Sequence, residues 1–285
     1  GMRKVCLVSL GCPKNLVDSE RILGALTSQG WAVTPDARAA DLIILNTCAF
    51  LSSAVEEAEA EIARLDAAKR DGTPLLVVGC YPQRAGRRLA GRREISGIVG
   101  TGDPLRVVRA VPQVLAGRRV CLVGPRPYVP RDAPPRLVLT WPHAYLKVSE
   151  GCNSRCTYCL IPRLRGPLRS RPLDEVVAEA RCLADAGIRE LVITGQDTTA
   201  YGSDRADGTS LSVLIQHLGG LPVRWIRILY GHPGRISRRL LSVMAETPSV
   251  CRYLDLPVQH SHPRILAAMG RPAADPLRLF DRIRR

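Results

Sequence analysis

The sequence predicts an α/β protein in which a doubly wound parallel sheet is followed by a partial β/α barrel. Two observations lead to this class. Short apolar runs of strand length alternate with amphipathic helical patterns through both halves of the chain. A stretch crowded with prolines interrupts this alternation once, near the middle. Strand-helix alternation buries parallel strands beneath helices, so each half is expected to form its own parallel sheet.

The first half, residues 1–116, is expected to be a domain with a doubly wound sheet. Its apolar runs are too short for helices and are expected to be buried strands, at residues 5–10, 42–45, 75–78 and 98–99. Helical patterns are expected to separate these strands, at residues 18–28, 52–69 and 104–115, with Ser52 as the N-cap of the second helix.

Residues 117–142 are expected to be an interdomain linker, because their closely spaced prolines exclude a helix. The alternation resumes in residues 143–285, which predict a second βα series that forms a barrel or part of one. The strands are expected at 144–149, 190–194, 225–229 and 253–256, and the helices at 173–186, 211–218 and 237–246.

The composition is strongly basic, with a formal net charge of +15. Of the 41 basic residues only four are lysine, which fits either a GC-rich genome or a surface that meets nucleic acid or the ribosome. Both explanations stay open, and direct nucleic-acid binding is left undecided. No apolar run approaches the length of a membrane span, and no signal pattern opens the chain, so we expect a cytoplasmic protein with no membrane partner.

The ten cysteines indicate metal binding rather than disulfides, because cytosolic thiols stay reduced. Three of them, Cys152, Cys156 and Cys159, lie within eight residues after an expected strand. Thiolates are the usual ligands of iron-sulfur cubanes, which take four, so three leave one iron free to bind a small molecule. A zinc knuckle is the alternative, and it needs a fourth ligand for which Cys182 and His143 are the nearest candidates.

A second set of cysteines follows three expected strands of the first domain. Cys12, Cys48 and Cys80 each come just beyond the carboxyl end of a strand. If these strands are neighbours, the thiols meet at one crevice of the sheet and can hold a second cluster. The alternative is three unrelated buried cysteines.

The spacing Cys-x3-Cys-x-aromatic-Cys, with Tyr158 before Cys159, resembles the radical S-adenosylmethionine superfamily. The resemblance implies that Cys152, Cys156 and Cys159 hold a 4Fe-4S cluster whose fourth iron binds S-adenosylmethionine. It also implies cofactor contacts at further positions: Tyr158 against the adenine, Gly195, Gln196 and Asp197 near the methionyl amino group, and Gln259 near the ribose or methionyl end.

The cysteine-bearing first domain ahead of this motif resembles the methylthiotransferases of the same superfamily. Four strings carry the resemblance, at residues 10–20 (LGCPKNLVDSE), 149–152 (SEGC), 195–202 (GQDTTAYG) and 256–260 (LPVQH). They favour the branch that modifies an aspartate of ribosomal protein S12 over the tRNA-adenosine branch, which stays as the alternative. An iron-sulfur binding or electron-transfer module is the alternative from another class.

The resemblance implies two 4Fe-4S clusters and S-adenosylmethionine as cofactors. By the same resemblance, one cluster, in the second domain, would generate a radical that removes hydrogen from the aspartate β-carbon, and the other, at Cys12, Cys48 and Cys80, would supply the methylthio unit. The implied partners are the small ribosomal subunit and a reductant such as flavodoxin or ferredoxin. Family members continue through two more barrel strands and a TRAM-like β-barrel domain, which we expect to be absent here because residue 285 follows the fourth strand closely.

Overall fold

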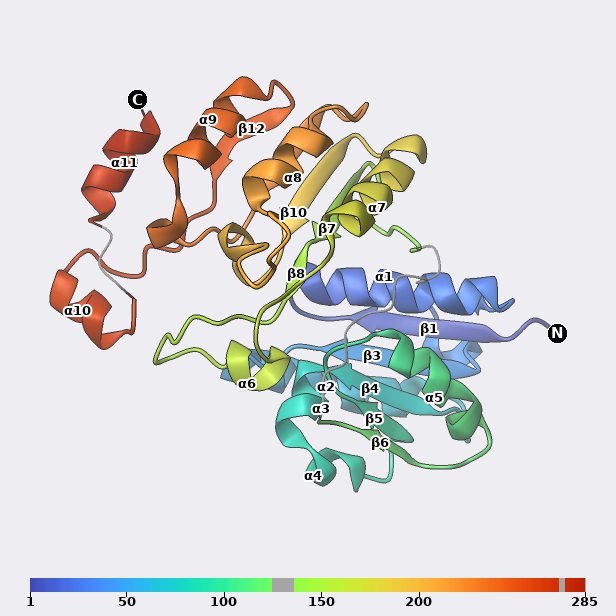
Figure 1. The fold of residues 1–285 in the computed structure, drawn as a ribbon. Helices are drawn as coiled ribbons and strands as arrows, with labels where there is room; N and C mark the ends of the chain where they lie inside the picture. Colours follow the sequence, from blue (N-terminus) through green and yellow to red (C-terminus); the bar gives the residue numbers. More distant parts are fainter. Residues whose placement is uncertain (125–135, 272–274, 285) are drawn as a thin grey trace. The chain divides into compact units, whose positions relative to one another are not determined.

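The computed structural model describes residues 1–124, 136–271 and 275–284, and the chain divides into two units, Gly1–Leu139 and Thr140–Arg285 (Figure 1). The prolines at 125, 127, 130, 134 and 135, on which the linker prediction depends, lie outside the described residues.

A six-stranded parallel sheet forms the centre of the first unit, with the strand order β2-β1-β3-β4-β5-β6. From β1 the chain runs to β2 on one side and then returns past β1 to β3 on the other side, so the topological switch point lies between β1 and β3. Ligands of doubly wound sheets bind at such a point, beyond the carboxyl ends of the strands. The strands are β1 (Lys4–Ser9), β2 (Ala32–Val33), β3 (Leu42–Thr47), β4 (Leu75–Gly79), β5 (Gly97–Val99) and β6 (Val120–Leu122).

Helices cover both faces of this sheet. One core cluster joins α1 (Pro13–Ser28) and α5 (Leu105–Leu115) to one face, through side chains that include Leu42 and Ile44 of β3. Side chains alternate along a strand, so Ile43 and Leu45, which are fully buried, face the other side, where α2 (Ser52–Ala68) contacts β3. The expected doubly wound parallel sheet is therefore confirmed. The remaining helices are η1 (Ala37–Ala39), α3 (Cys80–Ala85) and α4 (Arg87–Ala90).

Three details of the first half differ from the sequence prediction. Residues 120–122, expected within the linker, form β6, because their backbone pairs with β5 from Gly97 to Val99. Helix α1 begins at Pro13 rather than residue 18, since proline without its N–H fits the first turn of a helix. Ser52 is not the N-cap of α2; Leu51 holds that position and makes no side-chain cap bond.

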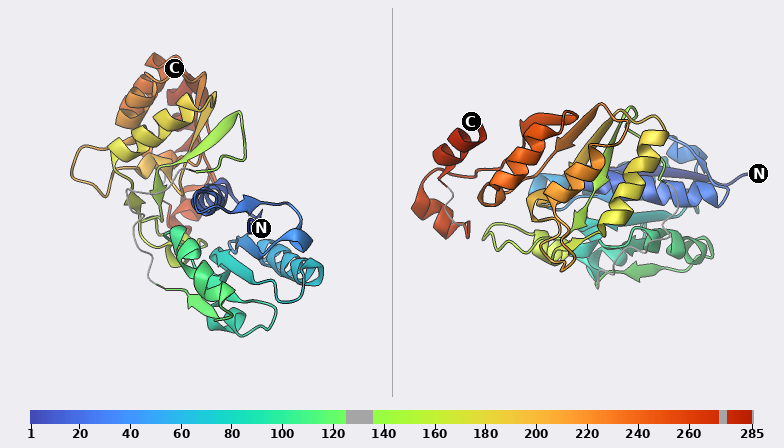
Figure 2. Two further views of the ribbon diagram at one scale, coloured as in Figure 1. Left: turned by 90° about the vertical axis from the view of Figure 1, so that its right-hand side faces the viewer. Right: turned by 45° about the horizontal axis from the view of Figure 1, so that its top comes forward.

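The second unit contains a four-stranded parallel sheet in the order β12-β11-β10-β7, which is the succession expected for part of a β/α barrel. Its helices α7, α8 and α9 lie side by side over one face of the sheet (Figures 1 and 2). The strands are β7 (His143–Lys147), β10 (Glu190–Thr194), β11 (Trp225–Ile228) and β12 (Val250–Leu254), and the helices are α7 (Leu173–Asp185), α8 (Leu211–Leu218) and α9 (Arg238–Glu246).

The smaller elements of the second unit lie in the segments that follow these strands along the chain. They are the antiparallel pair β8 (Ser149–Glu150) and β9 (Arg169–Ser170), α6 (Ile161–Arg165), η2 (Thr198–Ala200), η3 (Pro233–Arg235), α10 (Pro263–Ala268) and α11 (Pro276–Arg284).

The expected strand at 253–256 was placed too late in the chain. Strand β12 starts at Val250, because the bond from the Ile226 amide to the Ser249 carbonyl sets its register against β11. No helix in the described part of the chain is long and apolar enough to cross a membrane.

Candidate functional sites

All ten cysteines are free thiols, and six of them follow parallel strands as the sequence predicts. In the first unit, β1, β3 and β4 are neighbours, so the condition for bringing Cys12, Cys48 and Cys80 to one edge is met. Thr47 pairs in register with Gly79, and Cys48 and Cys80 are the residues that come next. All three cysteines therefore lie beyond the carboxyl ends of adjacent strands, beside the switch point.

The loops after β1 and β3 approach each other closely. Gly11 has φ +90°, and a Cβ added there would lie 2.7 Å from the Cβ of Cys48. Only glycine fits this position without strain, so Gly11 allows the Cys12 loop to pack against Cys48.

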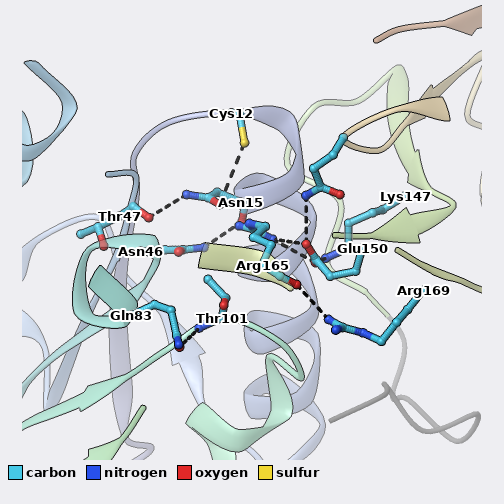
Figure 3. Close-up of polar contacts among 11 residues, drawn as sticks. Cys12, Asn15, Asn46, Thr47, Gln83, Thr101, Lys147, Glu150, Arg165 and Arg169 are labelled. Atoms are coloured by element: carbon cyan, nitrogen blue, oxygen red, sulfur yellow. Dashed lines mark hydrogen bonds and ion pairs between the residues drawn. The ribbon is translucent and has the colours of Figure 1, made fainter. Parts of the chain in front are cut away.

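A buried hydrogen-bond network fixes these loops to each other (Figure 3). The Asn15 side chain donates to the carbonyls of Leu10 and Thr47, at 3.2 and 2.9 Å. The side-chain amide of Asn46 in turn donates to the backbone carbonyl of Asn15 at 2.8 Å. The Thr47 hydroxyl donates to the Val78 carbonyl of β4 at 2.6 Å. This network links the ends of β1, β3 and β4, and so holds all three cysteine-bearing loops.

In the second unit, the loop with Cys152, Cys156 and Cys159 is closed at its base by paired residues. The Cys152 amide donates to the Gly166 carbonyl at 3.1 Å. Arg165 donates to both carboxylate oxygens of Glu150 at 2.9 Å, and Lys147 donates to one of them at 3.0 Å (Figure 3). These ion pairs bracket the three cysteines in sequence.

The charges at the base of the loop are buried. The side chains of Lys147 and Arg165 are 3% and 2% exposed, and that of Glu150 is 13% exposed. Burial raises the pKa of Glu150, but Arg165 and Lys147 outweigh it and hold that pKa well below its usual range.

The three thiols of this loop lie close enough to influence one another. Burial raises the pKa of the Cys159 thiol, and the neighbouring Cys156 and Cys152 raise it further. The Ser154 amide donates to Cys152 Sγ at 3.4 Å. Hydrogen bonds to ligand sulfurs are a regular feature of iron-sulfur sites, so the loop has the donors that such a cluster uses.

No group of three or more Cys, His, Asp or Glu side chains, among those that the structure describes, is arranged around a single metal ion. A cubane binds each thiolate through a different iron atom, so its ligands lie farther apart than those of one ion. Three free thiols on one short loop fit the ligand set of a cluster in this respect.

Of the other predicted cofactor contacts, Gly195 and Gln196 follow β10, Gln259 follows β12, and Tyr158 lies in the cysteine loop. Gly195 follows β10, and a Cβ there would lie 2.9 Å from Ser149 Oγ. Gln196 donates to Glu150 at 2.9 Å. Tyr158 is 43% exposed, and Gln259 is exposed with a φ of +70°.

Both carboxylate oxygens of Asp197, also predicted to contact the cofactor, are engaged by protein donors. One accepts from the Thr199 hydroxyl at 2.5 Å and the other forms an ion pair with Arg235, which also donates to Ser154 of the cysteine loop at 3.3 Å. Asp197 therefore helps to orient this loop through Arg235.

Sequence reasoning missed the charged residues that support the cysteine loop, namely Arg165, Arg235 and Arg271. Nothing in their spacing sets them apart from the many other arginines. Glu150 entered only as part of a family string, although a carboxylate directly before the Gly151-Cys152 pair was a signal.

Two family models match the chain. "Uncharacterized protein family UPF0004" covers residues 4–100 and "Radical SAM superfamily" covers residues 146–285. Curated relatives named "Ribosomal protein uS12 methylthiotransferase RimO" match nearly the whole chain. That of Trichlorobacter lovleyi is 45% identical over 96% of this chain and 62% of its own length, and that of Desulfosudis oleivorans is 46% identical over 99% and 66%.

The chain belongs to the radical S-adenosylmethionine methylthiotransferase family. Membership in this family implies 4Fe-4S clusters and S-adenosylmethionine as cofactors. The chain spans about 62% of the length of the first of these methylthiotransferase relatives.

Solved structures agree with the fold. The radical S-adenosylmethionine methyltransferase TsrM from Kitasatospora setae, with cobalamin and a 4Fe-4S cluster bound, has a TM-score of 0.69 at 16% identity, over 100% of this chain and 67% of its own. The cobalamin-dependent radical enzyme OxsB has a TM-score of 0.63 at 11% identity, over 96% and 46%. At these identities the likeness concerns the fold.

Proposed function

We propose that this protein is a methylthiotransferase that adds a methylthio group to the β-carbon of an aspartate of ribosomal protein uS12. The observation that carries the proposal is the presence of two cysteine trios, one in each unit, each beyond the carboxyl ends of parallel strands. The names of the relatives support the target, since the matched proteins are uS12 methylthiotransferases.

In the second unit, Cys152, Cys156 and Cys159 would hold a 4Fe-4S cluster. A cluster with one open iron and bound S-adenosylmethionine supplies an organic radical that can remove hydrogen from an unactivated carbon. The chain's own residues hold the loop in shape, through the Glu150 ion pairs at its base and Arg235 at its side.

Two buried polar atoms near the end of β10 are suited to the methionyl amino group. Ser149 Oγ and Gln196 Oε1 have no hydrogen-bond partner among the described residues. Buried acceptors without a partner are costly, and an ammonium group of the cofactor would satisfy both. Tyr158 would lie against the adenine, Gly195 would leave room for the methionyl group, and Gln259 would reach the ribose or methionyl end. Asp197 keeps Arg235 in place.

In the first unit, Cys12, Cys48 and Cys80 would hold the second 4Fe-4S cluster, where the methylthio unit is assembled. Cys12 precedes the first turn of α1, and the partial positive charge at the amino end of this helix favours an anionic set of ligands. The Asn15 and Thr47 hydrogen bonds keep the three loops in one arrangement, so little reorganisation is needed when the ligands bind.

The proposed partners are the small ribosomal subunit and a low-potential electron donor of the flavodoxin or ferredoxin type. The proposed substrate places the protein in the cytoplasm. We propose the domain limits 1–116 and 143–285 for the parts that carry the two cysteine sets.

The test separates the two clusters. After anaerobic reconstitution with iron and sulfide, Cys156→Ala is expected to abolish formation of 5'-deoxyadenosine from S-adenosylmethionine. Cys48→Ala is expected to retain it and to lose only the iron of the first unit. Equal loss of 5'-deoxyadenosine in both variants would contradict the assignment of roles to the two trios.

The target is tested in cells that lack the gene, complemented with the wild-type gene, Cys156→Ala or Cys48→Ala. Mass spectrometry of uS12 is expected to show the methylthio group only with the wild-type gene. A methylthio group found on tRNA nucleosides instead, with uS12 unmodified throughout, would assign the protein to the tRNA branch.

A further inference from the structure

A buried arginine lies against one of the predicted cluster ligands. Arg271 is 7% exposed, and its guanidinium donates to Cys156 Sγ at 3.7 Å and to the Pro257 carbonyl at 2.8 Å. The carbonyl holds one arm of the planar guanidinium, so the other arm is aimed at the sulfur.

The end of α10 positions this arginine. Gly270 has φ +66°, and the bond from the Arg271 amide to the Leu266 carbonyl, at 2.9 Å, turns the chain back over the helix. The Thr157 amide donates to the Met269 carbonyl at 3.1 Å. A Cβ on Gly270 would lie 2.5 Å from the Arg155 carbonyl oxygen, so this turn packs directly on the cysteine loop.

In the part of the chain that the structure describes, no Asp or Glu lies within ion-pair distance of the Arg271 guanidinium. A buried charge without a counter-charge is strongly unfavourable. Arg271 also forms a side-chain hydrogen bond with Tyr158, so the groups it contacts that can become anions are the Cys156 thiol and the Tyr158 phenol, whose pKa burial raises.

His232 is close enough to Arg271 for the two groups to interact. Burial, Arg271 and Arg235 together lower the pKa of His232 to about 4, against the opposing effect of Asp197. His232 is therefore neutral at pH 7 and adds no charge. The three thiolates of the loop, with the cluster that they hold, are suited to balance Arg271.

We propose that Arg271 is a positioning residue that hydrogen-bonds the Cys156 ligand and raises the reduction potential of the cluster in the second unit. The inference rests on the proposed function, which places a 4Fe-4S cluster on Cys152, Cys156 and Cys159. Reduction adds negative charge to the cluster, and a nearby cation with an N–H donor to a ligand sulfur stabilises that added charge. Arg271 thus makes it easier for a cellular donor to deliver the electron.

The test is a redox titration, followed by electron paramagnetic resonance, of the reconstituted full chain without S-adenosylmethionine and with dithionite as the electron source. It compares the wild type with Arg271→Met, which keeps the volume but removes charge and donors. The matched control is Arg264→Met, at an exposed position of α10, the helix that ends just before Arg271. To observe one cluster, all proteins carry Cys48→Ala.

We expect Arg271→Met to shift the midpoint to a more negative potential. The expected size is at least a tenfold lower ratio of reduced to oxidised cluster at a given potential, about 59 mV for a one-electron couple. Arg271→Lys, which keeps the charge, is expected to recover part of the shift, and Arg264→Met is expected to leave the potential unchanged.

An unchanged potential in Arg271→Met, with the cluster bound, would overturn the inference. A change seen only after S-adenosylmethionine is added would also overturn it, because Arg271 would then act on the carboxylate of the cofactor. If Arg271→Met fails to bind iron, Arg271→Lys decides: bound iron supports the need for a cation, and loss of iron with an intact fold contradicts it. Failure of the proposed function gives a different result: the reference protein, which keeps Arg271 and carries Cys48→Ala, would then bind no cluster in the second unit.

Discussion

Glu150→Gln is the substitution that tests most directly how the cysteine loop is held. The change keeps the size of the side chain and one acceptor for Gln196, but removes the negative charge that Lys147 and Arg165 share. Both cations are almost completely buried, and removing one partner of a buried ion pair costs about 3–5 kcal/mol. We expect a loss near the lower limit, about 3 kcal/mol, because the new amide still accepts one hydrogen bond.

The assay is urea unfolding of the apo protein, with Asp207→Asn as the matched control. Asp207 pairs with Arg205 at 2.6 Å, but the two side chains are 46% and 27% exposed, so breaking this solvent-screened pair is expected to change the free energy of unfolding little. Because Glu150 and Arg165 close the base of the loop, Glu150→Gln is also expected to lower the iron bound by Cys152, Cys156 and Cys159.

The dependence on pH gives a second check. The pKa of Glu150 is lowered in the folded protein, so its contribution is complete above the unfolded carboxyl pKa, about 4.3, and is lost as pH falls through the folded value. The difference between wild type and Glu150→Gln should therefore be constant from pH 6 to 8 and shrink below about pH 4. A loss at pH 7 no larger than that of Asp207→Asn would refute the reasoning.

Three further substitutions test other parts of the two sites. Gly11→Ala is expected to displace Cys48, because the new Cβ would lie 2.7 Å from the Cys48 Cβ, and the measure is loss of iron from the first unit with iron retained in the second. Asn46→Ala should lower the free energy of unfolding in urea by about 1–3 kcal/mol, since it leaves the Asn15 carbonyl and the Ser19 hydroxyl without their buried donor. A loss near zero would show that the network is dispensable. For His232, whose pKa is lowered to about 4 from about 6.5, the unfolded chain binds more protons between these values, so stability falls as pH drops below 6.5. Between pH 7.5 and 5 the wild type should lose about 1 kcal/mol more than His232→Asn, after allowance for partial exposure, and equal losses would contradict the shift.

Much of the fold follows from local patterns in the sequence. The runs at 42–45 and 75–78 are apolar throughout, which is typical of parallel strands buried on both faces, and the structure has strands there. Strand β6 was missed because three residues with one buried valine make no recognisable pattern; its pairing with β5 defines it. The same holds for β12, whose start depends on β11.

The thiols of both candidate sites could also be found from the sequence, because cysteine chemistry and strand ends are visible in it. The Cys152 trio lies in one short loop, so its members are neighbours whatever the rest of the chain does. Cys12, Cys48 and Cys80 are separated by more than thirty residues each, and their proximity became a firm statement only with the order β1-β3-β4.

By itself, then, the sequence determined the fold class, the ligand types and the chemistry expected of them, since these depend on local spacing and on the properties of side chains. Only the tertiary structure decided which groups support the ligands. Arg271 reaches Cys156 across 115 residues. Similarly, Gln196 reaches Glu150 across 46. Contacts of this kind arise from strand register and from the path of a helix end, and one arginine in a chain rich in arginine carries no local sign of the partner that it will meet.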